Sequence, residues 1–598
     1  MREASILRFN SFDGQPLVYR YWPATQAGTV TRAIVLLHRG HEHSGRLQHL
    51  VDELALADTP MFAWDARGHG LNDGPHGYSP SLGSTVRDLD MFVRHICHTY
   101  GLQPEQLVVI AQSVGAVLAA TWVHDYAPRI RALLLASPAF KVKLYVPFAR
   151  SLLRLRYRLG GNFFVNSYVK ARFLSHDPQR IASYNSDPLI TRPIAANILL
   201  ALYDTAERIV ADAGAITVPT LLLISGADFV VHKAPQRQFF ARLGATLKEQ
   251  LELPGFYHDT LGEQGREQAL DAIRRFIQRV EASPAAVPDL TYADTAGYTL
   301  DEYRRLQQTR SWLSPRRWQF ALTRMTLATL GRLSDGIRLG WQTGFDSGST
   351  LDYVYRNQEA GITPLGRWGD RAYLDSIGWV GIRQRKHHVE ELIARGGQLL
   401  REAGQPVRVL DIAAGHGRYV LDAVAATKPD HILLRDYSQL NVDAGRALIA
   451  QRQLMQLARF EPGDAFDRAS LAAIQPAPTL AIVSGLYELF ADNGLLRQSL
   501  AGLAEAMPAG SYLVYTNQPW HPQLEMIART LSSHRGGSDW IMRRRTQQEM
   551  DQLVAAAGFD KLEQRIDEWG IFTVSLARRR SDQPEQSASA VLQARTWA

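Results

Sequence analysis

A serine in the first third of the chain has the surroundings of a nucleophile. The apolar residues 107–110 lead into the pentapeptide Ala111-Gln-Ser113-Val-Gly115. A tight turn from a strand into a helix exposes a serine hydroxyl, provided that small residues flank it. The hydroxyl becomes nucleophilic when a base takes its proton and a third group orients that base. The sequence therefore predicts covalent catalysis at Ser113, which needs two partners.

The partners are expected in the chain order serine, acid, histidine. Asp228 follows the strand-like residues 220–224, and His258 follows the strand-like residues 249–253. Both stand where strands of a doubly wound sheet end, which is where such folds build their sites. We predict that His258 is the base and that Asp228 orients it. The alternative is that Asp228 caps a helix and His258 is a surface loop residue.

An acyl-transfer site also needs two backbone N–H groups for the negative charge that develops on the substrate oxygen. Val114, directly after the serine, is one expected donor, and Gly40, after the strand-like residues 33–37, is the other. The loop that holds Gly40, residues 38–45, also contains three histidines and Glu42. We predict no metal site there, because no His-Glu-x-x-His helix or second ligand cluster accompanies it.

A glycine-rich turn in the second half of the chain indicates a different chemistry. The apolar residues 407–410 lead into Asp411-Ile-Ala-Ala-Gly415-His-Gly417. Glycines let a backbone pass close to a ligand. The pattern differs from the dinucleotide motif G-x-G-x-x-G, because Val420 stands where the third glycine would be. The turn predicts a nucleotide-like cofactor, and a plain strand-to-helix turn is the alternative.

Acidic residues follow the next two strand ends. Asp436 comes about 20 positions after the glycines, the spacing at which an acid can bind ribose hydroxyls. Asp464 and Phe466 follow in the next strand-end segment, where an acid can bond an adenine amino group and a ring can pack on the base. Over residues 380–578, this series resembles class I S-adenosylmethionine-dependent methyltransferases.

The methyltransferase resemblance implies S-adenosylmethionine as the cofactor. It places Gly415 and Gly417 beside the methionine portion, Asp436 at the ribose, and Asp464 with Phe466 at the adenine. Asp411, which ends the strand before the turn, is counted with these cofactor-binding residues. Methyl transfer needs the donor carbon and the nucleophile in line, so positioning is expected to be most of the catalysis.

The methyl acceptor is not identified by the sequence. Tyr487 or Glu488 stands where it can orient or deprotonate an acceptor, or else it packs the start of a helix. Residues 517–521 follow the next predicted strand and also lie on the acceptor side. Residues 378–386 are expected to cover the cofactor as a lid, a hypothesis that gives Arg383 a role in binding.

The elements that must position these residues form two α/β domains. Short apolar runs alternate with helix-like stretches in both halves, as in strands buried on both faces of a parallel sheet. The fold class is therefore α/β, with two doubly wound domains joined by a helical, basic linker region. The predicted boundaries are residues 1–282 for the first domain, 283–345 for the linker region, 346–578 for the second domain and 579–598 for a polar, disordered tail.

Composition is that of a folded protein with several domains. The 598 residues exceed what one core can organise, and 46% of them are hydrophobic and 21% charged. The net charge of +7 is a mild excess that favours anionic partners. Cys97 is the only cysteine, so the chain forms no internal disulfide. We expect a cytoplasmic protein, because the sequence lacks a signal-peptide core and any run of 18 apolar residues.

Three segments of the first domain resemble monoglyceride lipases and bacterial lysophospholipases. Residues 38–45, His-Arg-Gly-His-Glu-His-Ser-Gly, resemble their oxyanion loop, and residues 65–70, Asp-Ala-Arg-Gly-His-Gly, resemble a strand-end motif. Residues 174–189 resemble part of their cap, and the whole resemblance spans residues 8–280. Arg39 and Ala111 depart from the family, which usually has glycine at both positions.

The lipase resemblance implies an α/β-hydrolase fold with a helical cap at about residues 141–200. It also implies an acyl ester of glycerol or glycerophosphate as the substrate and no metal. The chain as a whole resembles bacterial bifunctional proteins that join a lysophospholipase-like hydrolase to a class I methyltransferase. We therefore predict lipid ester hydrolysis together with methylation of an unknown acceptor, for which a lipid-derived molecule is the candidate. The alternatives are an active methyltransferase with a non-catalytic, lipid-binding hydrolase domain, and a membrane-recruited scaffold with two inactive sites.

Two basic segments favour contact with an anionic membrane. Residues 141–174 hold eight Lys and Arg and no acidic residue, and residues 303–341 hold eight Arg and one acid, Asp335. Basic surfaces interleaved with apolar side chains can bind anionic lipid headgroups, which would place the protein at the inner membrane surface. The alternatives are a solvated basic face for the first segment and a scaffold that docks the domains for the second. No nucleic-acid fold motif accompanies the charge, so nucleic acid is not an expected partner.

Overall fold

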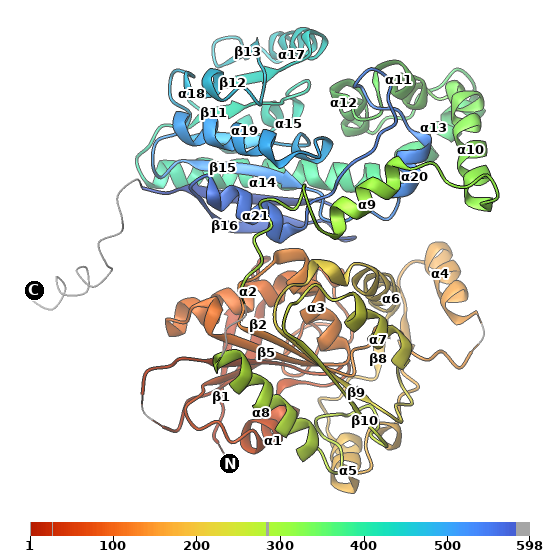
Figure 1. The fold of residues 1–598 in the computed structure, drawn as a ribbon, viewed down its shortest axis with the longest axis vertical. Coiled ribbons are helices and arrows are strands. Elements are labelled where there is room, and N and C mark those ends of the chain that lie inside the picture. The colour runs from red at the N-terminus through yellow and green to blue at the C-terminus, as the bar shows by residue number, and fades with distance from the viewer. Residues whose placement is uncertain (1, 27, 147, 283–285, 582–598) are drawn as a thin grey trace, which may run out of the picture. The chain divides into compact units, whose positions relative to one another are not determined.

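The chain folds into two compact units, each with its own sheet (Figure 1). The computed structural model describes residues 2–26, 28–146, 148–282 and 286–581. The first unit comprises Met1–Pro288 and the second Asp289–Ala598. Of the predicted tail, residues 579–598, the first residue ends strand β17 (Thr573–Arg579), and residues from 582 on lie outside the described residues.

The first unit is built on an eight-stranded sheet in the order β1-β2-β4-β3-β5-β6-β9-β10. The pairs β1–β2 and β2–β4 are antiparallel, and every pair from β4 to β10 is parallel. The strands are β1 Ser5–Asn10, β2 Pro16–Trp22, β3 Ala33–Leu37, β4 Met61–Trp64, β5 Leu107–Gln112, β6 Ala132–Ala136, β9 Thr220–Ser225 and β10 Lys248–Leu253.

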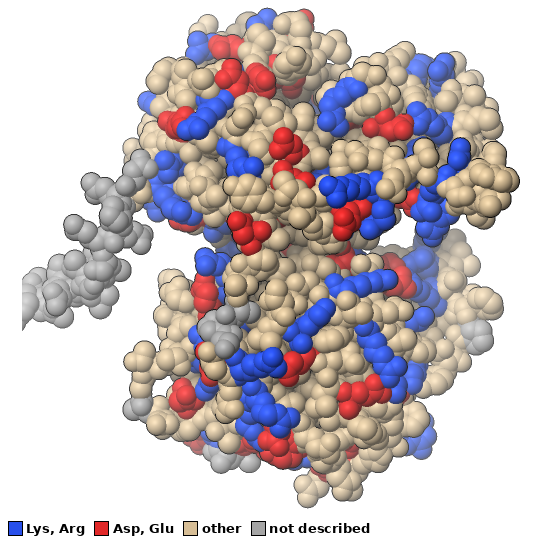
Figure 2. All heavy atoms as spheres, in the orientation of Figure 1, with Lys and Arg blue, Asp and Glu red and all other residues tan. Residues whose placement is uncertain are grey.

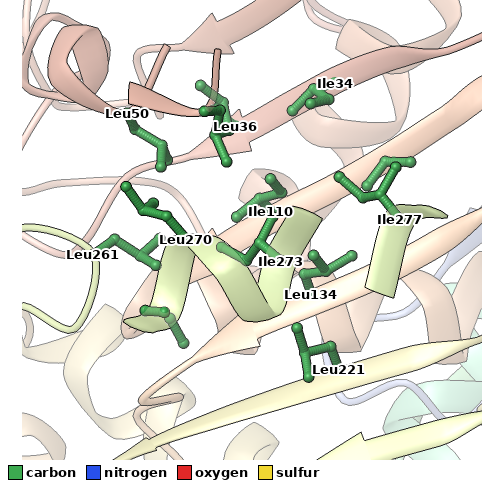
Figure 3. Close-up of a cluster of buried hydrophobic side chains, with 14 of the residues drawn as sticks. Ile34, Leu36, Leu50, Ile110, Leu134, Leu221, Leu261, Leu270, Ile273 and Ile277 are labelled. Carbon is green, nitrogen blue, oxygen red and sulfur yellow. The ribbon is translucent and has the colours of Figure 1, made fainter. Parts of the chain in front are cut away.

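Helices pack on both faces of this sheet, which makes the unit doubly wound (Figure 1). Figure 3 shows one face, where Leu270, Ile273 and Ile277 of α8 lie against strand residues such as Ile110 and Leu134. β3, β5 and β6 are buried along their whole length, as their continuous apolar runs predicted. The helices are α1 Gln48–Glu53, α2 Leu82–Tyr100, α3 Val114–Tyr126, α4 Ala149–Gly160, α5 Pro178–Ser186, α6 Ala196–Ala211, α7 Lys233–Arg242 and α8 Glu267–Ala282, with short 3-10 helices η1 Ser44–Leu47, η2 Pro104–Gln106, η3 Ala171–Phe173 and η4 Ala213–Ala215.

The long connection from β6 to β9 forms the cap of the first unit. It contains α4, α5 and α6 and a two-stranded antiparallel sheet of β7 (Phe164–Asn166) and β8 (Pro193–Ala195). α4 has no buried side chain, whereas α6 buries Leu202, Tyr203 and other residues. The cap is therefore firmly packed at α6 and open to solvent along α4.

The second unit is built on a seven-stranded sheet in the order β13-β12-β11-β14-β15-β17-β16. The strands from β13 to β15 run parallel, and β17 is antiparallel to both of its neighbours. Separate apolar clusters lie on its two faces, so this unit is also doubly wound. The strands are β11 Arg408–Asp411, β12 His431–Asp436, β13 Ala458–Pro462, β14 Leu480–Val483, β15 Tyr512–Asn517, β16 Phe559–Ile566 and β17 Thr573–Arg579.

The helices expected to form a linker region lie within the second unit. Leu306, Ile337 and Phe345 share a buried cluster with Trp379 of α14. The expected linker, residues 283–345, is thus part of this unit from Asp289 on, because its apolar side chains complete the unit's core. The helices are α9 Tyr298–Gln307, α10 Pro315–Ala328, α11 Asp335–Thr343, α12 Gly348–Arg356, α13 Pro364–Leu374, α14 Ile377–Glu402, α15 Arg418–Asp422, α16 Val424–Thr427, α17 Gln439–Gln451, α18 Arg468–Ala472, α19 Asn493–Ala506, α20 Leu524–Thr530 and α21 Gln547–Ala556, with η5 Leu330–Leu333 and η6 Tyr487–Leu489. Among the described residues, no helix is both long and apolar enough to cross a membrane.

Candidate active sites

Ser113 occupies the sharp turn between β5 and α3. Its backbone has φ 57° and ψ −116°, a conformation that residues other than glycine rarely adopt. A Cβ at Gly115 would lie 2.4 Å from the carbonyl oxygen of His38, so only glycine fits at that position. Ala111 is fully buried within β5, and the strand accommodates its methyl group. The turn thus presents the Ser113 side chain at the end of the sheet.

The structure brings Ser113, His258 and Asp228 into one hydrogen-bonded chain. His258 Nε2 lies 2.7 Å from Ser113 Oγ, and His258 Nδ1 lies 2.7 Å from Asp228 Oδ2. All three residues are buried. This geometry allows a proton to leave the hydroxyl for the imidazole while Asp228 holds the ring in position.

Asp228 is held as a carboxylate by its surroundings. Its Oδ1 accepts hydrogen bonds from the N–H groups of Val230 and Val231, at 2.6 and 2.9 Å. Burial opposes its charge, but the attraction to His258 and these hydrogen bonds outweigh burial, so the pKa of Asp228 lies below its ordinary value. It therefore keeps its negative charge beside the imidazole.

The two expected oxyanion donors lie side by side. A Cβ built on Gly40 would be 3.0 Å from Val114 Cγ2, and both residues line the same cavity as Ser113 and His258. Val114 begins α3, where the first N–H groups have no partner within the helix. Gly40 and Val114 are thus positioned for an oxygen bound next to Ser113.

Arg39, which departs from the lipase pattern, belongs to a buried ionic network. Its guanidinium pairs with Glu42 through Nε–Oε2 at 3.0 Å and Nη2–Oε1 at 2.6 Å, and its Nη2 lies 3.3 Å from Asp259 Oδ2. Arg180 of α5 also donates to Asp259 Oδ2, at 2.8 Å. Burial opposes these charges, but Arg180 and Arg39 hold the pKa of Asp259 far below its usual range. The oxyanion loop and the cap therefore both contact Asp259, which lies in the loop that carries His258.

The histidines of residues 38–45 have separate partners. His38 Nε2 accepts from the N–H of Ala66 at 3.0 Å, and His43 Nε2 lies 2.9 Å from Asp187 Oδ2 of the cap. His41 Nδ1 contacts the carbonyl oxygen of Thr191. Within the described residues, no group of three His, Cys, Asp or Glu side chains is arranged to hold a metal ion.

A cavity of about 590 Å³ opens above Ser113. A volume of this size is typical of ligand pockets. Its walls are mainly aliphatic and aromatic side chains of the cap, so they suit a hydrocarbon chain. They include Leu144, Leu152, Leu153, Val165, Leu199, Leu202 and Tyr203.

In the second unit, the glycine-rich turn follows β11 as predicted. Gly415 and Gly417 have φ values of 57° and 74°, in the left-handed region that favours glycine. A Cβ at Gly417 would lie 2.5 Å from Leu434 Cδ1, whereas at Gly415 the nearest atom is the Cα of Gly348, at 3.4 Å. The turn therefore packs on β12 through Gly417 and leaves Gly415 beside the start of α12.

The strand-end acids lie along the same edge of the sheet, because β13, β12 and β11 are parallel neighbours. Asp436 Oδ2 accepts from the Gly415 N–H at 2.9 Å, so the predicted ribose acid and the turn are in direct contact. Asp464 Oδ1 accepts from the Phe466 N–H at 2.9 Å, and the Phe466 ring packs edge-on against Phe490. This exposed acid and half-buried ring leave an accessible face at the predicted adenine end.

Asp411, the last residue of β11, stabilises the glycine-rich turn through buried hydrogen bonds. It is fully buried, and its carboxyl accepts hydrogen bonds from the Tyr419 hydroxyl and the Ala413 N–H. Burial raises the pKa of Asp411 to about 7, and the nearby charge of Asp436 acts in the same direction. With the open backbone at Gly415 and the row of strand-end acids, these residues fit the cofactor that the turn predicts.

The structure separates the alternatives on the acceptor side. The Tyr487 hydroxyl donates to Ser499 Oγ at 2.9 Å within a buried cluster, so Tyr487 packs the core. Glu488 lines a second cavity, together with Gln518 and His521 from the segment 517–521. The predicted acceptor-side residues thus meet at one cavity, and the acceptor itself stays a prediction.

The expected lid, residues 378–386, is part of the continuous helix α14. Arg383 Nη1 donates to the carbonyl oxygen of Leu374, and Arg385 lines the cavity instead. A role for Arg383 in cofactor binding stays a prediction, and helical spacing explains why Arg385 lines this cavity. Trp379, Ile382 and Arg385 are three residues apart and share one face, a signal that was present in the sequence.

Sequence comparison identifies the family. The Escherichia coli (strain K12) protein named Uncharacterized protein YnbC is 58% identical over 575 residues, which are 96% of this chain and 98% of that protein. This chain belongs to the YnbC family. Two family models divide the chain between them: "Serine aminopeptidase, S33" matches residues 28–265, and "Putative methyltransferase" matches residues 273–579.

Lipases resemble the first unit of this YnbC-family chain. Monoacylglycerol lipase of Mycolicibacterium smegmatis is 25% identical over 272 residues, 45% of this chain and 95% of that protein. Human Monoglyceride lipase is 28% identical over 230 residues, 36% of this chain and 71% of that protein. A structure of a soluble variant of monoglyceride lipase from Saccharomyces cerevisiae has 17% identity and a TM-score of 0.43, covering 47% of this chain and 96% of that one. The chain joins an α/β-hydrolase domain that resembles monoglyceride lipases to a methyltransferase-family domain.

Proposed function

We propose that the first unit is a serine hydrolase that cleaves acyl esters of the lysophospholipid or monoacylglycerol type. The observation that carries this proposal is the chain Ser113–His258–Asp228 at the base of an apolar cavity. The likeness to lipases supports the substrate class.

In the proposed reaction, Ser113 Oγ attacks the ester carbonyl carbon as its proton passes to His258 Nε2. The N–H groups of Gly40 and Val114 donate to the resulting oxyanion. The acyl–oxygen bond then breaks, and the leaving alcohol takes the proton from His258. Water, deprotonated by the same imidazole, releases the fatty acid and restores Ser113.

A panel of lysophospholipids and monoacylglycerols tests this activity, with released fatty acid as the readout. We expect release by the native protein and none by Ser113→Ala. If the folded native protein releases no fatty acid from any lipid of the panel, the hydrolase proposal fails and the alternative of a non-catalytic, lipid-binding domain is favoured.

For the second unit, we propose transfer of a methyl group to a lipid-derived acceptor. S-adenosylmethionine, when bound, supplies an electrophilic methyl group on a sulfonium. Gly415 and Gly417 would border its methionine portion, Asp436 would accept from the ribose, and Asp464 with Phe466 would contact the adenine. Asp436 Oδ2 retains a lone pair for this after its bond to Gly415.

Calorimetric titration with S-adenosylhomocysteine tests the cofactor site directly. We expect binding by the native protein and at least ten-fold weaker binding by Asp436→Ala. Asp443→Ala is the matched control, because this acid lies on the exposed side of α17. Equal binding by Asp436→Ala and the native protein would contradict the assigned site.

We propose further that the protein is cytoplasmic and binds the anionic inner membrane surface. Leu155 and Leu159 of α4 are 55% and 80% exposed, beside Arg156 and Arg158. α10 likewise exposes Trp318, at 63%. Figure 2 shows basic side chains near the position of α10 in Figure 1. Flotation with vesicles containing phosphatidylglycerol should carry the protein upward at low salt, and phosphatidylcholine vesicles should not. No flotation at low salt would exclude this contact.

A further inference from the structure

The second unit encloses a cavity on the acceptor side of the proposed cofactor site. Its volume is about 360 Å³, and its walls come from α10 to α14, from α20 and from the loops after β14 and β15. Most of the lining is apolar, and it includes the rings of Trp379, Trp540 and Phe572. Its size is at the lower end for ligand pockets and suits one hydrocarbon chain.

Five side chains that line this cavity carry a buried polar atom without a hydrogen-bond partner in the described part of the chain. These atoms are Tyr373 Oη, Arg385 Nε, Glu488 Oε2, Gln518 Nε2 and Trp540 Nε1. Native proteins leave few buried polar groups unpaired, because each costs free energy. Five such side chains around one cavity indicate that a ligand supplies partners there, and Arg385, Glu488 and Gln518 are the most polar of them.

The chemistry of these side chains specifies the polar part of the ligand. Arg385 and Gln518 provide N–H donors, and so require an acceptor oxygen. Glu488 provides an acceptor: its Oε1 is bonded to Thr516 Oγ1 at 2.8 Å and lies 3.6 Å from Arg385 Nη1, which leaves Oε2 for a donor. The ligand head must therefore offer an acceptor to Arg385 and Gln518 and a donor to Glu488, and a hydroxyl beside a second oxygen supplies both.

His521 adds a further donor to the same wall. Its Nδ1 accepts from the Gln523 N–H at 3.0 Å, which assigns the ring hydrogen to Nε2. Burial lowers the pKa of His521 to about 4, so the imidazole is neutral near pH 7. The cavity thus presents a neutral donor beside the Arg385–Glu488 pair.

We propose that this cavity binds the methyl acceptor, an amphipathic molecule with one hydrocarbon chain and a head in which a hydroxyl lies beside a carbonyl or carboxylate oxygen. Arg385 and Gln518 donate to the second oxygen, Glu488 accepts from the hydroxyl, and the aromatic wall packs on the chain. This assignment rests on the proposed methyl transfer, since it names the acceptor of that site.

Binding of 3-hydroxydecanoate, measured by calorimetry on the full chain, tests the proposal without turnover. We expect it to bind at least ten-fold more tightly than decanoate, both with and without S-adenosylhomocysteine. Gln518→Leu should weaken it at least five-fold while leaving the melting temperature unchanged or higher, because the variant removes an unpaired buried amide. Arg385→Met should also weaken binding.

Two controls isolate the site. Arg383→Met changes an arginine on the same helix that does not line the cavity and should bind as the native protein does. Leu153→Trp narrows the cavity of the first unit and should also leave the affinity unchanged. Equal affinity for decanoate and 3-hydroxydecanoate, or native affinity in Gln518→Leu and Arg385→Met, would overturn the proposal. Failure of S-adenosylhomocysteine to bind would instead count against the proposed methyl transfer.

Discussion

Arg39 Nη2 and Asp259 Oδ2 lie 3.3 Å apart, which joins the loop after β3 to the loop that carries His258. Asp259 directly follows the proposed base and also pairs with Arg180 of the cap. A residue that departs from the lipase pattern thus connects the oxyanion donor to the histidine. The structure accommodates an arginine at this position because the carboxylates of Glu42 and Asp259 neutralise its charge.

Removal of the Arg39 charge should destabilise the first unit. Arg39→Met leaves two buried carboxylates with fewer partners, and we expect a loss of about 3 kcal/mol in the free energy of unfolding together with slower ester hydrolysis. Urea titration measures the first effect. Arg8→Met is the control, because Arg8 pairs with Asp73 on the surface, and it should change stability by less than about 0.5 kcal/mol. Equal effects of the two variants would contradict the role of the network.

Strain in the backbone of Ser113 should appear as a difference in stability between the glycine and alanine variants at this position. Ser113→Gly and Ser113→Ala both lose the hydroxyl, so both should abolish hydrolysis. Only glycine relieves the conformation at φ 57°. We expect Ser113→Gly to be more stable than Ser113→Ala by about 1 kcal/mol, measured by urea titration of both. Identical midpoints would show that the turn is not strained.

Gly417 should be intolerant of a side chain for two separate reasons. Gly417→Ala adds left-handed strain and an overlap with Leu434, so we expect a loss of about 2–4 kcal/mol and weaker S-adenosylhomocysteine binding. Gly404→Ala is the control, because Gly404 has φ 67° but nothing within 4 Å of a Cβ. It should cost about 1 kcal/mol and leave binding intact. If the two variants behave alike, the contact with Leu434 has no consequence.

Asp411 should make the stability of the second unit depend on pH. An unfolded aspartate ionises near pH 4, whereas the folded pKa is about 7, so the native state holds an extra proton between these values. Stability therefore falls as pH rises through this window and levels off above it. Asparagine does not titrate. The stability of Asp411→Asn relative to the native protein should rise by on the order of 2 kcal/mol between pH 5 and pH 8. A constant difference in urea titrations across this range would refute the raised pKa.

The sequence predicted the strands that are buried on both faces of their sheet. Three strands begin and end where they were predicted, namely residues 33–37, 132–136 and 480–483. A short continuous apolar run is typical of a central strand in a parallel sheet. The edge strands β1 and β16 were missed, since they are partly exposed and carry a weaker pattern. Local patterns also found the order Ser113, Asp228, His258.

Contacts between distant segments could not be predicted in the same way. The pairing of Arg39 with Asp259 joins positions more than 200 residues apart, and no local pattern signals such a contact. The walls of the acceptor cavity likewise come from distant segments. They include α11, which was expected to belong to the linker region, α12 at the start of the predicted second domain, and the loops after β14 and β15. The position of Arg385 could have been predicted from helical spacing, whereas the burial of the Gln518 amide nitrogen without a partner depends on tertiary packing.

The uneven anchoring of the cap has a kinetic consequence. Arg180 and Asp187 fix the α5 end of the cap to the loops around the catalytic residues, whereas α4, which forms one wall of the cavity, buries no side chain. α4 is held to α6 by the ion pairs of Arg150 and Arg154 with Asp204 and Glu207, so displacing α4 breaks these pairs but exposes no buried side chain of its own. The residence time of an acyl chain should depend on this one helix, so product escape can be tuned there independently of bond cleavage at Ser113.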